Sequence, residues 1–223
     1  MTFFSLGPRI PSILRTMKTL IITALHGEIK LILSHFDARK MTKLGGPTRL
    51  YECNENIACL TIGMGLTRAE KSMSKFLALY KPDLVLQIGV SGALHPDLKI
   101  GDYVIPHTIH AIGESGILCL DDINVTESEV EVKKGHFWSS HHIIESASEK
   151  QHIQDKTQSI AVDMESYAVA KACLDAGIRY NSLRIISDLA NDSARDDFKI
   201  NFLKTSNLLQ EFMLQNIVPV FNL

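Results

Sequence analysis

The stretch that decides the fold is IAVDMESYAVAKACLDAGIRYNSLRIISDLAN, residues 160–191. It begins with an apolar run ending in D-M-E, continues with alanines at helical spacing up to a glycine, and closes with the apolar run Leu183–Ile186. This pattern predicts a strand, a helix and a second strand. Because ligands of open α/β sheets bind beyond the carboxyl ends of strands, we expect Glu165, Ser187 and Asp188 at such a crevice.

Each of the two carboxylates also has a purely structural explanation. An acidic residue near a helix start complements the helix dipole, and an aspartate after a strand often caps the next helix. The residues alone therefore leave both a structural and a catalytic role open for Glu165 and for Asp188.

A third acidic position follows the first predicted strand. Residues 19–24 are rich in β-branched side chains, which is typical of a buried strand. They lead into L-H-G-E and then into apolar residues at helix-compatible spacing, so Glu28 is expected in the first turn of a helix. Complementing the helix dipole is again the structural alternative.

The most strand-like run of the chain is residues 83–90, which are apolar at nearly every position and are predicted to form a central strand. Ser91, Gly92 and Ala93 follow it and are expected to form a loop. Their small side chains would leave space for a ligand, although a tight turn requires a glycine equally. Strands that alternate with helices along the chain predict an α/β fold.

A pair of glycines, Gly63 and Gly65, lies between a predicted strand and a helix expected from Thr67 to about Tyr80. Glycines at such a junction can cradle a phosphate, but close packing of a strand on a helix selects the same residues. The third glycine of the dinucleotide-binding fingerprint is missing. A Rossmann dehydrogenase is therefore disfavoured.

The composition predicts a single globular domain over residues 19–223, preceded by an extension over residues 1–18 in which Met17 is an alternative start. Of the 223 residues, 45% are hydrophobic, and the net charge of -2 comes from interspersed acidic and basic residues. Such a charge pattern offers no basic face, so we expect no nucleic-acid partner. We also expect no membrane span, and no signal peptide, because the first 16 residues lack a continuous apolar core followed by a cleavage site.

The cysteines and histidines show no metal-binding spacing. The four cysteines are scattered and without a C-x-x-C pair, so they are expected to be reduced, packed thiols of a cytoplasmic protein. His136, His141 and His142 cluster in sequence but lack an H-E-x-x-H pattern, so neither a metal nor another cofactor is expected.

Near the carboxyl terminus, residues 192–197 are predicted to be a mobile connection. Residues 198 to about 218 are predicted to form a long amphipathic helix packed on the sheet.

Several motifs together resemble the purine nucleoside phosphorylase and nucleosidase superfamily, which includes the methylthioadenosine/S-adenosylhomocysteine nucleosidases. V-D-M-E-S-Y-A-V-A followed by R-I-I-S-D resembles its signature, and T-A-L-H-G-E-I and residues 87–106 are similar to further segments. The resemblance implies a three-layer α/β/α fold with a mixed, partly barrel-like central sheet. It also implies a homodimer or larger homo-oligomer that acts on a small purine nucleoside.

The same resemblance implies cleavage of the N-glycosidic bond. Asp188 would be the acid that protonates the purine, which requires a raised pKa, and Glu28 would activate water. Glu165 would bind the ribose hydroxyls. The other residues assigned to substrate binding are Met164 against the sugar, Ser91 and Gly92 in the pocket wall, and Ser187 and Arg184 supporting Asp188 and the water side.

Two alternatives remain at this point. L-G-G-P near residue 45 and A-V-D-M-E-S also resemble the hopanoid-associated phosphorylase branch, which acts on an adenosyl-lipid, and Arg49 or Arg68 could then serve phosphate. The loop H-G-E-I lacks an arginine and so favours water. A non-catalytic nucleoside-binding protein is the second alternative, against which the three acidic positions argue.

One segment departs from the pattern of the resembling family. The stretch S-S-H-H-I-I lacks the aromatic residue expected in the purine pocket of methylthioadenosine nucleosidases, so it does not indicate how the leaving group is recognised.

Overall fold

The computed structural model describes residues 19–114, 118–119 and 130–218, in which ten strands form one mixed sheet. The strands are β1 (Thr19–Thr23), β2 (Arg39–Gly45), β3 (Thr48–Glu52), β4 (Ile57–Thr61), β5 (Leu84–Ala93), β6 (Tyr103–Ala111), β7 (Leu118–Cys119), β8 (Val132–Ser139), β9 (Ser159–Asp163) and β10 (Arg179–Asp188). The helices are α1 (Lys30–His35), α2 (Leu66–Leu77), α3 (Ala147–Thr157), α4 (Ser166–Asp175) and α5 (Ala194–Phe212). Short 3-10 and π-helical turns cover His26–Glu28 and Met213–Ile217.

The sheet closes on itself around β5. In the order β10-β6-β8-β9-β5, each strand pairs with the next, and β5 pairs again with β10. An extension β1-β4-β3-β2 continues from the other edge of β5. The predicted mixed, partly barrel-like sheet is therefore confirmed, and the largely apolar strand β5 is central, as expected for a strand covered on both faces.

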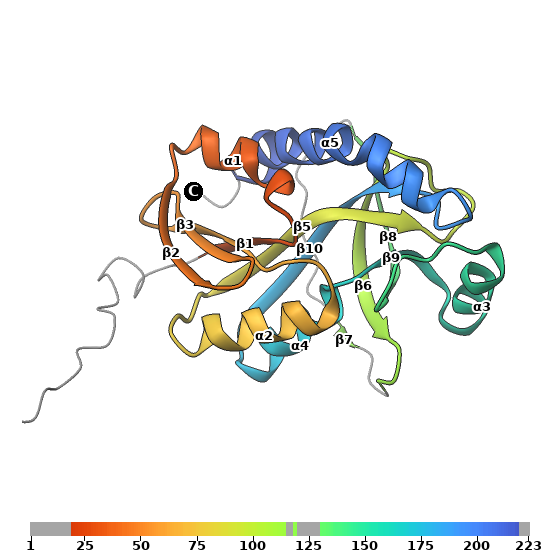
Figure 1. Cartoon of the computed structure of the whole chain (residues 1–223), viewed down its shortest axis with the longest axis horizontal. Helices are drawn as coiled ribbons and strands as arrows, with labels where there is room; N and C mark the ends of the chain where they lie inside the picture. Colours follow the sequence, from red (N-terminus) through yellow and green to blue (C-terminus); the bar gives the residue numbers. More distant parts are fainter. Residues whose placement is uncertain (1–18, 115–117, 120–129, 219–223) are drawn as a thin grey trace, which may run out of the picture.

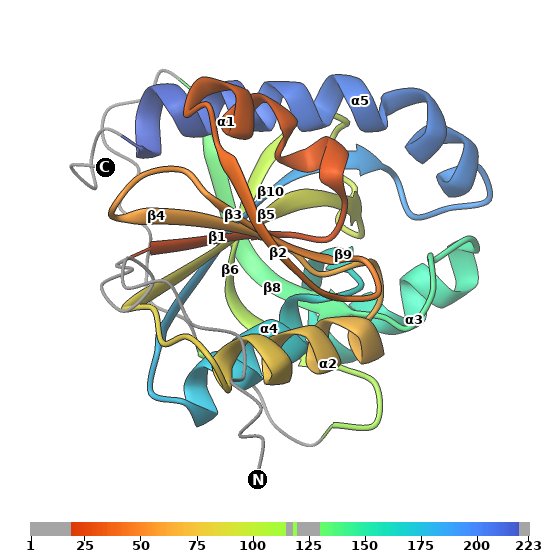
Figure 2. The ribbon, with the colours of Figure 1, turned by 60° about the vertical axis from the view of Figure 1, so that its left-hand side comes forward.

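Helices cover the sheet on two sides (Figure 1). α1 and α5 lie on one side, where Ile32, Leu209 and Phe212 pack on Ile21 and Ile88 of the sheet. α2 and α4 lie on the other side and contact each other (Figure 2). The two apolar clusters between these layers form the core of the predicted α/β/α arrangement.

The predicted loop after the central strand is wrong, because β5 continues through Ser91 and Gly92 to Ala93. Towards its end the strand acquires a new partner: Gly92 and Ala93 pair with Val162 and Ala161 of β9. Backbone groups in the last part of β5 thus gain hydrogen-bond partners from a strand about 70 residues away, which no local pattern reveals.

Two further expectations about the second half of the chain are corrected. The supposed mobile connection over residues 192–197 is largely the first turn of α5, which begins at Ala194 with Asp196 and Asp197 complementing the helix dipole. The long helix ends at Phe212 and continues as a π-helical turn to Ile217.

Helix α3 was not expected from the sequence. Its start is capped by the Ser146 hydroxyl, which accepts a hydrogen bond from the Glu149 N–H. None of the helices in the described part of the chain is long and apolar enough to cross a membrane.

Candidate active site

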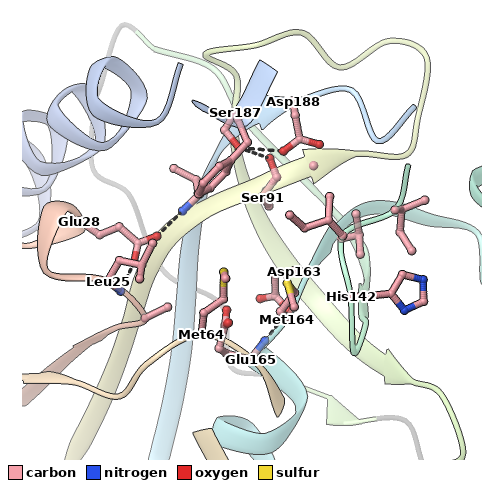
Figure 3. Close-up of a pocket in the computed structure, with 17 residues that line it drawn as sticks. Leu25, Glu28, Met64, Ser91, His142, Asp163, Met164, Glu165, Ser187 and Asp188 are labelled. Atoms are coloured by element: carbon pink, nitrogen blue, oxygen red, sulfur yellow. Dashed lines mark hydrogen bonds between the residues drawn. The ribbon is translucent and has the colours of Figure 1, made fainter. Parts of the chain in front are cut away.

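The carboxyl ends of β1, β5, β9 and β10 surround a cavity that is partly open to solvent, the place where ligands of open α/β sheets bind. The three acidic residues singled out in the sequence, Glu28, Glu165 and Asp188, all line it, although they are far apart in the chain. Figure 3 shows the three carboxylates on different sides of the site, with Glu28 at the left, Asp188 at the upper right and Glu165 below both.

Glu28 is held by backbone amides and not by a helix. It ends the short 3-10 turn after β1, and α1 begins only at Lys30. Its carboxylate accepts the N–H of Leu25 at 2.7 Å and the N–H of Val90 in β5 at 3.1 Å. Burial raises the pKa of Glu28, while these amides and the charge of Arg184 counteract part of the rise. A raised pKa brings a carboxylate closer to the range in which it can act as a general base near neutral pH.

Glu165 does not serve the helix start, although it occupies the position immediately before α4. Its side chain reaches across the cavity wall and accepts the N–H of Gly65 at 2.7 Å. Gly65 has a φ of 104°, a conformation that favours glycine. This amide, one of the groups considered for phosphate binding, is therefore already donated to a carboxylate.

Asp188 is fixed by its neighbours at the end of β10. Its carboxylate accepts the Ser187 hydroxyl at 2.9 Å and the N–H of Ala190 at 3.1 Å. Burial raises the pKa of Asp188, the direction that a proton donor requires, and these two bonds oppose part of the rise. Gly92 makes room for it: a β-carbon there would lie 2.7 Å from Asp188 Oδ1.

Beside these residues lies a buried ion pair that the sequence analysis missed. Asp163, which also lines the cavity, accepts Arg184 Nη2 at 2.7 Å and the Ser139 hydroxyl at 2.7 Å. It further accepts the N–H groups of Glu165 and Ser166 at 3.3 and 3.2 Å and the Ser166 hydroxyl. Asp163 therefore caps α4 and leaves Glu165 free to face the cavity. The aspartate of D-M-E, followed by a helix, was the signal for this cap.

Arg184 lies behind the cavity wall. The residue is 0% exposed and is not among the cavity-lining residues of the described chain, and it pairs with Asp163 rather than with Asp188, which it was expected to support. A β-carbon on Gly89 would lie 2.5 Å from Arg184 Nη1 and 2.7 Å from Glu28 Oε1. The guanidinium thus borders Glu28 as well as Asp163.

The remaining predicted substrate-binding residues, Ser91, Gly92, Met164 and Ser187, line the cavity. Within the described residues, the buried Ser91 hydroxyl has no hydrogen-bond partner, so it is available to a ligand or to water. Apolar wall residues include Val162, Ile143 and Phe198. Phe198 was not anticipated, because it comes from α5 and reaches the cavity only through the packing of that helix across the sheet.

In the part of the chain that the structure describes, no group of three or more histidine, cysteine or carboxylate side chains is arranged to hold a metal ion. His136 interacts with the Thr108 hydroxyl, and His142 lines the cavity with its Nε2 3.0 Å from Glu149 Oε1.

The cysteines that the structure describes are free thiols. Cys59 and Cys173 are buried and Cys53 is half-buried; the side chain of Cys119 lies outside the described residues.

The ionisation of Glu165 should make the ligand-free protein less stable as the pH rises. Burial, followed by the negative charge of Asp163, raises its pKa from 4.5 to about 8. The folded state therefore holds a proton that the unfolded chain has lost between these two values. Stability due to Glu165 is fully present below pH 4.5 and is lost as the pH rises through 8.

In this window, one such proton lowers the unfolding free energy by up to about 1.4 kcal/mol per pH unit. We expect Glu165→Gln, which can still accept the Gly65 amide, to show a correspondingly flatter dependence in denaturant titrations between pH 5.5 and 8. Equal slopes for both proteins would mean that Glu165 is ionised throughout this range.

Comparison with known proteins gives a family and several similar structures. Residues 18–218 match the family model described as the phosphorylase superfamily. A mutant of the Helicobacter pylori methylthioadenosine/S-adenosylhomocysteine nucleosidase, solved with 5′-methylthioadenosine in the active site, has a TM-score of 0.82 and 22% sequence identity, over 93% of this chain and 99% of that one.

Two other similar structures carry related activities in their names. The Helicobacter pylori futalosine hydrolase has a TM-score of 0.83 and 23% identity, covering 93% of this chain and 99% of its own. The Streptococcus pyogenes S-adenosylhomocysteine nucleosidase, in complex with 5-methylthiotubericidin, has a TM-score of 0.80 and 18% identity, covering 89% and 95%. At these identities the likeness is one of fold.

Proposed function

This chain is an enzyme of the phosphorylase superfamily, and we propose that it hydrolyses the N-glycosidic bond of a purine nucleoside, with adenine as the leaving base. The observation that carries the proposal is the convergence of Glu28, Glu165 and Asp188 on one cavity. Cleavage of this bond builds positive charge on the sugar, which favours the ionised form of Glu165 in the complex, and a carboxylate stabilises such charge.

Each carboxylate is assigned one task in this proposal. Asp188, whose pKa is raised, donates a proton to the departing purine, and the apolar wall formed by Val162, Ile143 and Phe198 receives the base. Glu165 accepts the hydroxyls of the ribose, against which Met164 packs. Glu28 removes a proton from the attacking water, and the free hydroxyl of Ser91 is available to orient that water or the sugar.

Water is favoured over phosphate as the nucleophile by the charge of the cavity. A phosphate site needs positive side chains or free backbone amides. Among the described cavity-lining residues there is no lysine or arginine, and neither Arg49 nor Arg68 is one of them. The Gly65 amide is occupied by Glu165. The names of the similar structures, nucleosidases and a hydrolase, agree with this choice.

The proposal is tested by measuring release of free purine base from adenosine, methylthioadenosine, S-adenosylhomocysteine and futalosine, each with and without phosphate. We expect release of adenine and free sugar from at least one adenine nucleoside, at a rate that phosphate does not change, whereas cleavage of futalosine alone would contradict adenine as the leaving base. Strict dependence on phosphate, with formation of a sugar 1-phosphate, would replace hydrolysis by phosphorolysis. Binding of nucleosides without release from any of them would favour a binding protein. The homo-oligomeric state and the cytoplasmic location stay predictions.

A further inference from the structure

Two cysteines outside the cavity lie close enough to react with each other. Cys53 Sγ and Cys59 Sγ are 3.2 Å apart, and neither residue lines the cavity. A disulfide requires sulfurs at about 2.0 Å, so closure needs the two sulfur atoms to approach each other by about 1 Å. The other described free thiol, Cys173, is buried in α4, in the opposite helical layer.

The backbone around this pair is held firmly. β3 and β4 form an antiparallel hairpin in which Tyr51 faces Cys59. Beyond the ladder, the N–H of Cys53 donates to the carbonyl of Ile57 at 3.0 Å, and the Asn54 side chain accepts two N–H groups of the turn. The two thiols are thus presented by a fixed turn on the same face of the hairpin, next to the apolar cluster beneath α1.

We propose that Cys53 and Cys59 form an oxidisable dithiol, a modification site whose co-reactant is a low-molecular-weight disulfide such as oxidised glutathione. Cys53 is half-buried and Cys59 is 0% exposed, which assigns the first attack to Cys53. Its thiolate attacks one sulfur of the co-reactant, whose sulfur–sulfur bond breaks, and one small thiol leaves with a proton. Cys59 then attacks Cys53 Sγ, the mixed disulfide breaks, and the second small thiol leaves.

The exchange is balanced, because the protein loses two electrons and two protons and the small disulfide gains them. Burial, followed by the neighbouring Cys53, raises the pKa of Cys59 well above its usual value. The second step therefore needs a thiolate that is scarce at neutral pH, and we expect ring closure to become faster as the pH rises.

The experiment treats the native protein with oxidised glutathione and follows intact mass, free thiols and Tm. Wild type should lose two of its four thiols with no retained glutathione, and peptide mapping should identify a link from Cys53 to Cys59. Because the link restricts the unfolded chain, although less than a link closing a long loop would, Tm should rise on the order of 5 °C. Adenine release, if present, should not change.

Three variants separate the roles of the thiols. Cys59→Ser should stop at a glutathione adduct on Cys53, Cys53→Ser should lose no thiol pair, and Cys173→Ser should behave like wild type. The proposal is overturned if native wild type keeps all four thiols while the urea-unfolded protein reacts, or if mapping finds a different pair. Loss of two thiols in Cys53→Ser would overturn it equally.

Discussion

Asp188→Asn is expected to lower the turnover of a purine nucleoside about a hundredfold or more, which is the usual contribution of a positioned general acid. The amide has nearly the same shape and can still accept the Ser187 hydroxyl or the Ala190 N–H, so the end of β10 should keep its conformation. It cannot supply the proton that the purine nitrogen needs as the bond breaks. The loss should therefore appear in kcat, while the affinity for a substrate analogue changes little.

A matched control is available on the same protein. Asp175 lies at the end of α4, is exposed and pairs with Lys171, so Asp175→Asn makes the same chemical change away from the cavity and should leave kcat unaltered. Near-normal turnover by a folded Asp188→Asn protein would remove Asp188 from the role of acid. A loss of binding equal to the loss of turnover would instead make it a ground-state contact.

Glu28→Gln should abolish detectable hydrolysis, with a loss of at least about a hundredfold. Water is a weak nucleophile, and the carboxylate of Glu28 is the group assigned to activate it. The variant also decides the reaction class. If phosphate were the nucleophile, no base would be required for its attack, and the wild type would depend on phosphate while Glu28→Gln retained much of its phosphorolysis.

The measurement is a time course of free base and sugar product with and without phosphate, for wild type, Glu28→Gln and Glu165→Gln. Glu70→Gln, on the exposed surface of α2, serves as the control for the substitution itself. Substantial hydrolysis by a folded Glu28→Gln protein would show that another group, or none, activates the water.

The concentration of buried charge around the cavity explains why these residues must be changed conservatively. Asp163 and Arg184 form an ion pair in which both side chains are 1% exposed. Removing one partner of such a pair leaves an uncompensated buried charge, which commonly destabilises a protein by about 3–5 kcal/mol. Truncation of Asp163 or Arg184 would therefore report mainly on folding, whereas the amide variants of Asp188 and Glu28 keep the shape of the site.

Local patterns in the sequence were sufficient for much of the fold and for the choice of acidic residues. The strand–helix–strand run over residues 160–191 formed as predicted, with α4 between β9 and β10, because apolar periodicity and a terminating glycine are local properties. The same run placed Glu165 and Asp188 after strands, and the short strand β1 led directly to Glu28. The family resemblance supplied the barrel-like sheet, which the pairing of β5 with β9 and β10 confirms.

Tertiary structure decided how the acidic residues are used. Glu165 stands where a helix-dipole partner is expected, and only the approach of Gly65, 100 residues earlier, draws its carboxylate to the cavity while Asp163 takes over the cap. Glu28 is bound by an amide of β5, and Phe198 enters the cavity because α5 crosses the sheet. These contacts join segments that are distant in sequence, so their geometry depends on how strands pair and helices pack, which the periodicity of a single segment does not encode.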